Sequence, residues 1–250
     1  MTGITAVILT KNEALRIRRC LDALKGWADE IIIVDDESID NTCTIAKEEY
    51  GARVIVRALE NAFDKQRNCG MEAAQTTWVL QMDADEVIPA ETKELINQAI
   101  KKTDHAAFEI LRQDCVGEIA LKHVGGAYQL KLLQKGKGTY QGNIHEAFVT
   151  RGSVGRIQGI VLHYAIGSVS QMLAKQNHYS DLESERYLRE HPEIDVKKIK
   201  HDLIFKTPSI FFKHYVKRGG FKDGLPGLVW SVIHTMHPMM FWLKVLEKMK

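Results

Sequence analysis

The 250-residue sequence lacks the features that mark several protein classes. Its four cysteines, Cys20, Cys43, Cys69 and Cys115, form no CxxC pair, so we expect neither a zinc site nor a disulfide framework. It has no uninterrupted apolar stretch of about 20 residues, the length that a membrane-spanning helix requires. Its N-terminus shows no signal-peptide pattern. We therefore expect a globular protein of the reducing cytoplasm.

Two phosphate-binding motifs are also missing. No GxGxxG follows the first predicted strand, which weakens a dinucleotide-binding interpretation, and no GxxxxGK[ST] occurs, which excludes a P-loop. A nucleotidyltransferase would normally have a glycine-rich phosphate loop near that strand, where this chain has Thr-Lys-Asn-Glu. The sequence therefore disfavours a nucleotidyltransferase.

Charge is unevenly distributed along a chain whose formal net charge is only +2. From Lys197 to Lys250 there are eleven Lys and Arg against three Asp and Glu, which gives this segment +8 and the rest about −6. A basic segment on a mildly acidic body indicates an anionic partner, for which nucleic acid and a membrane surface are the two candidates.

The last part of the basic segment, residues 224–250, is apolar and aromatic, but two prolines, two histidines and a lysine interrupt it. These interruptions argue against a membrane span. One expectation is a helix lying in a membrane interface, with Trp230 and Trp242 at headgroup depth. The other is a C-terminal helix packed on the protein's own core. The first favours an anionic membrane, and no nucleic acid, as the partner.

Apolar runs and helical periodicities alternate through the first half of the chain. Strands are expected over 4–10, 30–34, 54–56 and 78–82. Helices are expected over 42–51 and around 67–74, and after Asn12, a candidate N-cap, with apolar positions at Leu15, Ile17, Leu21 and Leu24. This order predicts an α/β fold, a mostly parallel sheet with helices on both faces. Short strands are expected over 107–111, 128–133 and 157–163, and helices from 168 onward. We expect two domains, 1–165 and a helical, basic and amphipathic region over 166–250.

Ligands of such sheets bind where the strands end at their carboxyl edge. Asp83 and Asp85 directly follow an apolar strand and can both reach one Mg²⁺ or Mn²⁺, with phosphate oxygens at other positions. An isolated DxD is more often a solvated turn, but its place at the end of a buried strand favours a metal. His163, at the end of a later strand, is a candidate third ligand.

Other polar residues suit nucleotide binding or proton transfer. Asp35 and Asp36 end the second strand, where a carboxylate can accept hydrogen bonds from a base imide or from ribose hydroxyls. Arg67 is either a surface arginine or a partner of phosphate or base oxygens. Glu146, beside His145, can act as a general base because its neighbours can tune its pKa.

Four segments in order carry a resemblance: AVILTKNEALRIRRCLDAL, EIIIVDDESIDNT, FDKQRNCGMEAAQTTWVLQMDADE and GNIHEAF. Together they resemble the GT-A glycosyltransferases of family 2, and most of all the bacterial lipopolysaccharide-core β-glucosyltransferase branch, over about residues 4–165. The resemblance implies a GT-A (Rossmann-like) fold, a donor that is usually a UDP-sugar, a Mn²⁺ or Mg²⁺ ion, and inversion at the anomeric carbon.

The resemblance also implies roles for individual residues. Nucleotide-sugar binding would fall to Thr10, Asn12, Glu13, Asp35, Asp36, Arg67 and Asp83. The metal would be held by Asp85 and Asp83 with His163. Glu146 would be the catalytic base, with His145 as the alternative, and the chain has His-Glu here where the commoner family pattern has Glu-Asp.

The expected function is transfer of a sugar to a lipid-linked or lipopolysaccharide-core saccharide, by a protein peripherally bound to the inner face of the cell membrane. The acceptor hydroxyl attacks in line, one base removes its proton, and the metal neutralises charge on the leaving phosphate. Two alternatives stay open: a peptide or protein glycosyltransferase of the same fold, and a non-catalytic sugar-nucleotide-binding protein.

Overall fold

A computed structural model describes residues 3–59, 62–101, 103–142, 147–166, 169–191 and 193–249. The chain divides into two compact units, which are described in turn. Unit 1 comprises Met1–Arg112 and Ala127–His163, and unit 2 comprises Gln113–Gly126 and Tyr164–Lys250. The domain boundary expected at 165 stays a prediction.

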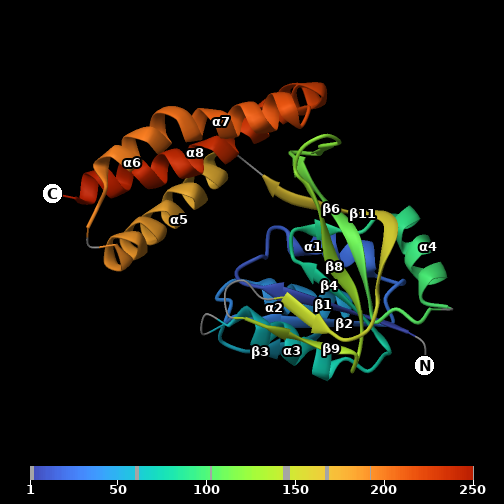
Figure 1. Ribbon diagram of the computed structural model, residues 1–250. Helices are drawn as coiled ribbons and strands as arrows, with labels where there is room; N and C mark the ends of the chain where they lie inside the picture. The colour runs from blue at the N-terminus through green and yellow to red at the C-terminus, as the bar shows by residue number, and fades with distance from the viewer. Residues whose placement is uncertain are drawn as a thin grey trace. The chain divides into compact units, whose positions relative to one another are not determined.

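Unit 1 is built on a mixed sheet with a parallel half (Figure 1). Its strands are β1 (Ile4–Thr10), β2 (Glu30–Asp35), β3 (Arg53–Val56), β4 (Trp78–Asp83), β5 (Glu86–Val87), β6 (Ala107–Val116), β8 (Gly126–Gln134) and β11 (Val154–Ile166). They lie in the order β3-β2-β1-β4-β8-β6-β11-β5. β3, β2, β1 and β4 are parallel, whereas β8 pairs antiparallel with β4, and β5 with β11. The expected α/β fold is confirmed.

Helices cover both faces of this sheet. Successive side chains of a strand point to opposite faces, so the buried strands contribute to two apolar clusters, one on each face. Ile8 of β1 belongs to the cluster with α1 (Ile17–Leu24), α2 (Thr42–Tyr50) and α4 (Ala90–Ala99). Val7 belongs to the opposite cluster, with α3 (Phe63–Ala73) and the small sheet of β9 (Gly138–Gln141) and β10 (Ala147–Thr150). Gly70 lets α3 approach β1 closely, because a Cβ there would overlap the side chain of Val7.

One expectation about the helices is wrong, and one observed helix has no counterpart among those expected. The first helix begins at Ile17 and not near Leu15, whose side chain is 92% exposed. The residues before Ile17 form a loop whose backbone groups bond to the loop after β2, and this pairing has no signature in the apolar periodicity. Helix α4, after Pro89, was not expected from the sequence at all, although Ile96 anchors it in the core.

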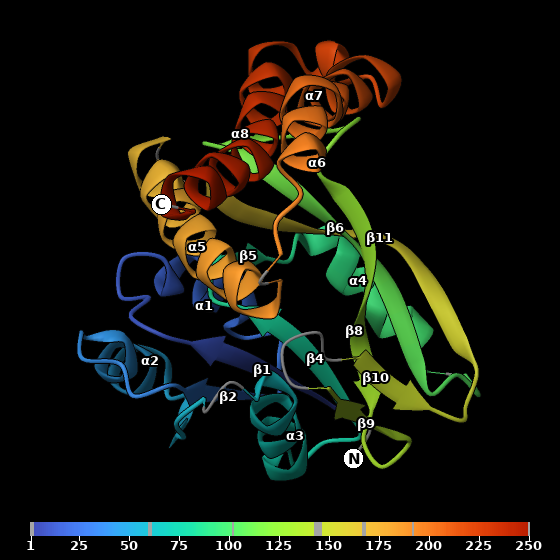
Figure 2. The same cartoon turned by 60° about the vertical axis from the view of Figure 1, so that its left-hand side comes forward.

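Unit 2 is mostly helical (Figures 1 and 2). Its segments are α5 (Val169–Glu190), α6 (Val196–His201), the π-helical η1 (Asp202–Lys206), α7 (Thr207–Phe212), the π-helical η2 (Lys213–Lys217), the 3₁₀ turn η3 (Gly220–Asp223) and α8 (Gly224–Lys248). Helix α8 packs along α5. The end of β6 and the short strand β7 (Ile119–Ala120) pair antiparallel and complete the unit.

Both tryptophans of α8 are core residues. Trp242 is 9% exposed and packs edge-on against Tyr187 of α5, with ring centroids 5.4 Å apart. Trp230 is 5% exposed, and its indole N–H donates to Asp114 Oδ2 at 3.0 Å. The expectation that these rings lie at headgroup depth is wrong, and core packing accounts for this face of α8. No helix in the described part of the chain is long and apolar enough to cross a membrane.

Candidate functional site

The carboxyl ends of β1, β2 and β4 meet at one edge of the sheet. Thr10 is in register with Asp35 of β2, and Leu9 is in register with Asp83 of β4. The parallel pairing thereby brings the polar residues that end these strands to the same edge, as the order of strands in the sequence predicts.

Asp35 organises the loop that follows β2. Its buried carboxylate accepts hydrogen bonds from the Thr10 hydroxyl at 2.6 Å, the Ser38 hydroxyl at 2.7 Å and the Ser38 backbone N–H at 2.7 Å. These three donors occupy both carboxylate oxygens. The structure therefore gives Thr10 and Asp35 a structural task, and their expected contact with the nucleotide stays a prediction.

The loop after β1 is bonded to the loop after β2. The Asn12 side-chain oxygen accepts from the Ile39 N–H at 2.9 Å, and the Asn12 N–H donates to Ser38 Oγ at 2.7 Å. The Glu13 N–H donates to Thr42 Oγ1 at 2.8 Å. Asn12 has a φ of +54°, in the left-handed region that asparagine tolerates. The shape of this edge of the sheet is thus set by hydrogen bonds between these two loops.

Asp36 is the more accessible carboxylate of the pair, with 21% of its side chain exposed. Its Oδ1 accepts from the Leu59 N–H at 2.8 Å, and its Oδ2 lies 3.5 Å from Lys11 Nζ. The next residue, Glu37, has a φ of +50°, which is strained for a residue with a Cβ. Such strain is often stored at functional sites.

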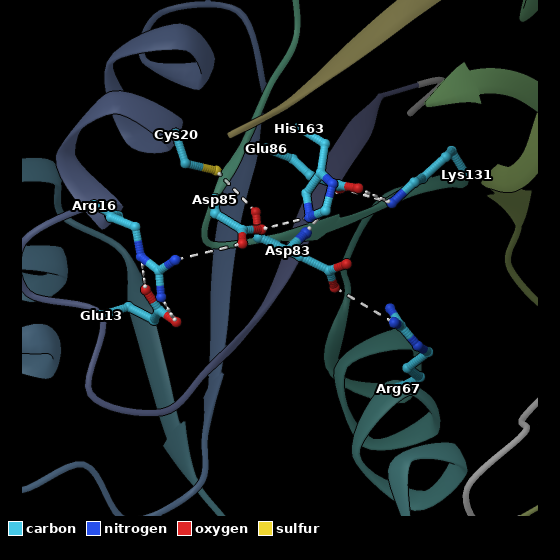
Figure 3. Close-up of polar contacts among 9 residues, drawn as sticks. All are labelled: Glu13, Arg16, Cys20, Arg67, Asp83, Asp85, Glu86, Lys131 and His163. Atoms are coloured by element: carbon cyan, nitrogen blue, oxygen red, sulfur yellow. Dashed lines mark hydrogen bonds and ion pairs between the residues drawn. The ribbon is translucent and has the colours of Figure 1, made fainter. Parts of the chain in front are cut away.

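Asp85 and His163 face each other across the turn after β4 (Figure 3). Asp85 Oδ1 lies 3.6 Å from His163 Nε2, because the antiparallel pairing of β11 with β5 sets His163 opposite Glu86. Asp85 Oδ2 lies 3.7 Å from the guanidinium of Arg16, which also binds Glu13 at 2.7 and 2.8 Å. Arg16 thereby links Glu13, in the loop after β1, to Asp85 of the DxD motif.

Asp83 turns toward a different partner, Arg67 of α3, with Asp83 Oδ1 3.4 Å from the guanidinium (Figure 3). Burial alone would raise the pKa of Asp83, but the charges of Lys131 and Arg67 outweigh burial and lower it. Within the described ranges, no group of three or more His, Cys, Asp and Glu side chains is arranged to hold a metal ion. The geometry brings together Asp85 and His163, and the three-ligand set stays a prediction.

A buried ion pair lies directly behind the DxD motif. Lys131 Nζ is 2.7 and 2.6 Å from the two carboxylate oxygens of Glu86, and Glu86 Oε2 also accepts from the Asp83 N–H at 3.0 Å. Burial raises the pKa of Glu86, although the Lys131 charge acts in the opposite direction. Burial and the nearby carboxylates also raise the pKa of the Cys20 thiol, whose sulfur lies 3.7 Å from the Asp83 carbonyl oxygen.

A cavity of about 370 Å³ opens beside Asp83 within unit 1. Its walls come from α3, β4, β6, β8, β9 and β10, and they consist of Arg67, Gln81, Asp83, Arg112, Gln129, Leu130, Lys131, Tyr140, Ala147 and Phe148. Arg67 lies over the Tyr140 ring, 5.6 Å from its centroid. Arg67 is therefore grouped with Asp83 and not with Asp35 or Asp36.

Sequence reasoning missed several residues of this edge. For Arg16 the sequence signal is weak: it lies three residues after Glu13 at the start of a helix, a spacing that allows an ion pair. Lys131 carries a stronger one, because a charged residue inside an apolar strand run requires a buried partner. Gln81 and Arg112 give no comparable signal. The two catalytic candidates, His145 and Glu146, lie outside the described residues.

Comparisons with known proteins identify the family of this chain. The family model described as glycosyl transferase family 2 matches residues 5–159. The lipopolysaccharide core biosynthesis glycosyltransferase LpsC of Rhizobium meliloti is 24% identical over 254 residues, 98% of this chain and 92% of the relative. An uncharacterized glycosyltransferase of Rickettsia bellii is 28% identical over 92% of this chain and 81% of its own.

The fold is shared with proteins of known structure, among them a mannosyltransferase. The mannosyltransferase PcManGT of Pyrobaculum calidifontis, determined with GDP-Man and Mn²⁺, superposes with a TM-score of 0.52 at 11% identity. The superposition covers 100% of this chain and 89% of the mannosyltransferase. The GT-A fold expected from the sequence is confirmed.

Proposed function

The chain belongs to glycosyl transferase family 2, and we propose that it transfers a sugar, with inversion, from a UDP-sugar to a lipid-linked or lipopolysaccharide-core saccharide. The observation that carries this proposal is the meeting of Asp36, Asp83 and Asp85 at the carboxyl edge of the parallel strands. The likeness to LpsC over nearly the whole chain supports a lipopolysaccharide-core acceptor.

The residues after β4 fit a divalent cation. A carboxylate of Asp85 and an imidazole nitrogen of His163 face each other at 3.6 Å, and Mg²⁺ or Mn²⁺ is commonly held by one or two protein side chains together with substrate phosphates. Asp85 and His163 would hold the ion, with Asp83 beside them. When bound, the ion neutralises negative charge on the leaving diphosphate.

The remaining roles follow from charge and access. Asp36, the more accessible member of its pair, would accept hydrogen bonds from the base, while Asp35 keeps the loop in shape. Arg67 would balance charge beside Asp83. Glu146 would take the proton from the acceptor hydroxyl, with His145 as the alternative.

Calorimetric titration with UDP, in Mn²⁺ and then in EDTA, tests the donor and metal assignments. We expect binding in Mn²⁺ that EDTA abolishes and that Asp85→Asn weakens at least about tenfold, since hydrogen bonds and ligation to charged groups contribute roughly 1.5–3 kcal/mol. Asp104→Asn, a change to an exposed carboxylate away from this edge, should leave UDP binding unchanged. Metal-independent binding, or equal behaviour of the two variants, would contradict the assignment.

We also propose that unit 2 holds the protein at the inner, cytoplasmic face of an anionic membrane, through the exposed residues of 196–225, here called the basic face. All eight Lys and Arg of 196–222 are exposed, and the single acidic residue there, Asp202, is buried. Exposed apolar side chains are interspersed among them: Ile204, Phe205, Phe212, Val216, Phe221 and Leu225. Interspersed basic and large apolar side chains are the composition that binds anionic lipid surfaces.

Co-sedimentation with vesicles tests the basic face. We expect binding to vesicles of phosphatidylglycerol and phosphatidylcholine but not to phosphatidylcholine alone. Changing Lys206, Lys213 and Lys217 together to glutamine should weaken binding about 100-fold, at about 1 kcal/mol for each lysine near the surface. The control variant changes three exposed lysines of unit 1, Lys47, Lys101 and Lys137, to glutamine. It removes the same amount of charge from a different part of the protein. Equal losses in the two triple variants would refute a specific basic face.

A further inference from the structure

Arg16 contacts both of the groups of side chains to which the proposed function assigns the donor. Its guanidinium bonds to Glu13, in the loop after β1, through Nε at 2.7 Å and Nη2 at 2.8 Å. Its Nη1 lies 3.7 Å from Oδ2 of Asp85, whose other oxygen faces His163 (Figure 3). Arg16 therefore joins a loop of the nucleotide candidates to a proposed ligand of the divalent cation.

The two contacts of the Arg16 guanidinium differ in kind. Glu13 takes the planar fork of Nε and Nη2 in a bidentate hydrogen-bonded pair. The distance of 3.7 Å from Nη1 to Asp85 exceeds the roughly 2.7–3.2 Å of an N–H···O hydrogen bond, so this contact is an ion pair only. With 40% of the Arg16 side chain exposed, an oxyanion can reach it from solvent. Nη1 can therefore exchange Asp85 for a phosphate oxygen while the pair with Glu13 stays in place.

Helix stability does not explain an arginine at this position. Arg16 is the N-cap residue of α1, and its side chain makes no capping hydrogen bond. Ser, Thr, Asp and Asn are the side chains that stabilise an N-cap, and the positive end of the helix dipole disfavours a cation there. The first turn of α1 also contains no acidic residue. The position is therefore better suited to an anion that binds beside Arg16 than to the stability of the helix.

We infer that Arg16 binds the diphosphate of the donor, and that a phosphate oxygen replaces Asp85 as the partner of Nη1. The inference rests on the proposed function, to which it adds a residue that recognises the leaving group. A nucleoside diphosphate whose base binds beside Asp36 and whose phosphates reach Asp85 spans the two groups that Arg16 contacts. Because negative charge grows on the diphosphate as its bond to the sugar breaks, a guanidinium held there by Glu13 stabilises the departure of UDP.

Saturation-transfer NMR on the full chain in Mg²⁺ tests the inference, with UDP and uridine as probes and their uracil protons as the signal. Arg16→Gln should weaken UDP binding about tenfold, as the loss of a charge-assisted hydrogen bond at a partly exposed site predicts. The affinity for uridine, which has no phosphate, should stay unchanged. The matched control is Arg18→Gln, which changes an exposed arginine of the same helix that forms a similar bidentate pair with Glu49, at 2.9 and 2.6 Å. This control should alter neither affinity.

A second background separates a contact with phosphate from an effect on Asp85. In an Asp85→Asn protein, Arg16→Gln should again weaken UDP binding about tenfold, because effects that do not pass through a shared partner add. If the effect disappears in this background, Arg16 acts through Asp85 and the inference fails. Unchanged UDP affinity in Arg16→Gln, equal losses for UDP and uridine, or equal effects of the two arginine variants would also overturn it. Absence of UDP binding to the unaltered protein would instead contradict the proposed function.

Discussion

Removing the ammonium group of Lys131 should destabilise unit 1, because it leaves the carboxylate of Glu86 buried without its counter-ion. Glu86 is fully buried and Lys131 is 3% exposed, and both carboxylate oxygens lie within 2.7 Å of the lysine nitrogen. Breaking a buried pair by removing one partner typically costs about 3–5 kcal/mol. Lys131→Met keeps an unbranched apolar side chain out to the Cε position and removes the ammonium group.

Protonation of Glu86 limits this cost. A carboxyl group with the ordinary pKa of 4.5 must be protonated at pH 7, about 2.5 pH units above that pKa. At 1.36 kcal/mol per unit, this protonation costs about 3.4 kcal/mol. At pH 5 the same step costs only about 0.7 kcal/mol. In the variant the folded-state pKa of Glu86 lies above its unfolded value, so stability is retained at low pH and lost as pH rises through the folded pKa. The destabilisation should therefore shrink by about 2–3 kcal/mol between pH 7 and pH 5.

The assay is the labelling rate of Cys20, a fully buried thiol of the unit 1 core, resolved from the other cysteines by peptide mass spectrometry. The rate, relative to that of an unfolded peptide, gives the free energy of opening. The control, Lys137→Met, changes an exposed lysine just beyond the same strand and should cost less than about 0.5 kcal/mol. A Lys131→Met cost equal to that of the control, or equal at pH 7 and pH 5, would refute the reasoning.

Three further predictions concern single residues. Partial burial would raise the pKa of Asp223, but hydrogen bonds from a histidine ring and three backbone N–H groups lower it. Asp223→Asn should therefore lower the free energy of unfolding by about 1–3 kcal/mol, measured by urea unfolding near neutral pH. That difference should vanish as pH falls below the ordinary value of 3.8 and through the lowered pKa, and a difference that does not depend on pH would contradict this account. Gly70→Ala should cost about 1–3 kcal/mol in the same assay, because its Cβ would overlap Val7. Glu146→Gln should lower transfer about 10²- to 10⁴-fold in a radiolabelled-sugar assay without changing UDP binding; retained transfer would assign the base elsewhere.

The parallel half of the sheet could be predicted because its strands are buried on both faces. β1 is a continuous apolar run and was expected with the bounds observed, Ile4–Thr10. The expected second strand, 30–34, differs from the observed β2 by one residue. Once these strands are parallel, the residues that end them must meet at one edge, so the position of Asp83 beside the end of β1 followed from the sequence.

Contacts between segments distant in sequence could not be predicted in this way. The pairing of Lys131 with Glu86 joins residues 45 positions apart on strands that are not neighbours in the chain. The segment Gln113–Gly126 belongs to unit 2, although the sequence places it among the middle strands. Asp223 explains this, because its carboxylate accepts from the backbone N–H groups of residues 122–124 at 2.9–3.2 Å. No local periodicity reports such a bond.

In each of the two acidic motifs of the sequence, the two carboxylates have different partners. Asp35 is consumed by its own loop, which leaves Asp36 at the surface of the edge. Asp83 is paired with Arg67 at the cavity, whereas Asp85 faces His163. Neutralising Asp35 or Asp83 should therefore disturb the shape of the loop or the charge of the cavity. Neutralising Asp36 or Asp85 should instead remove the contact that we propose for the nucleotide or the metal. Adjacent carboxylates in a motif of this kind are better treated as separate elements than as one cluster.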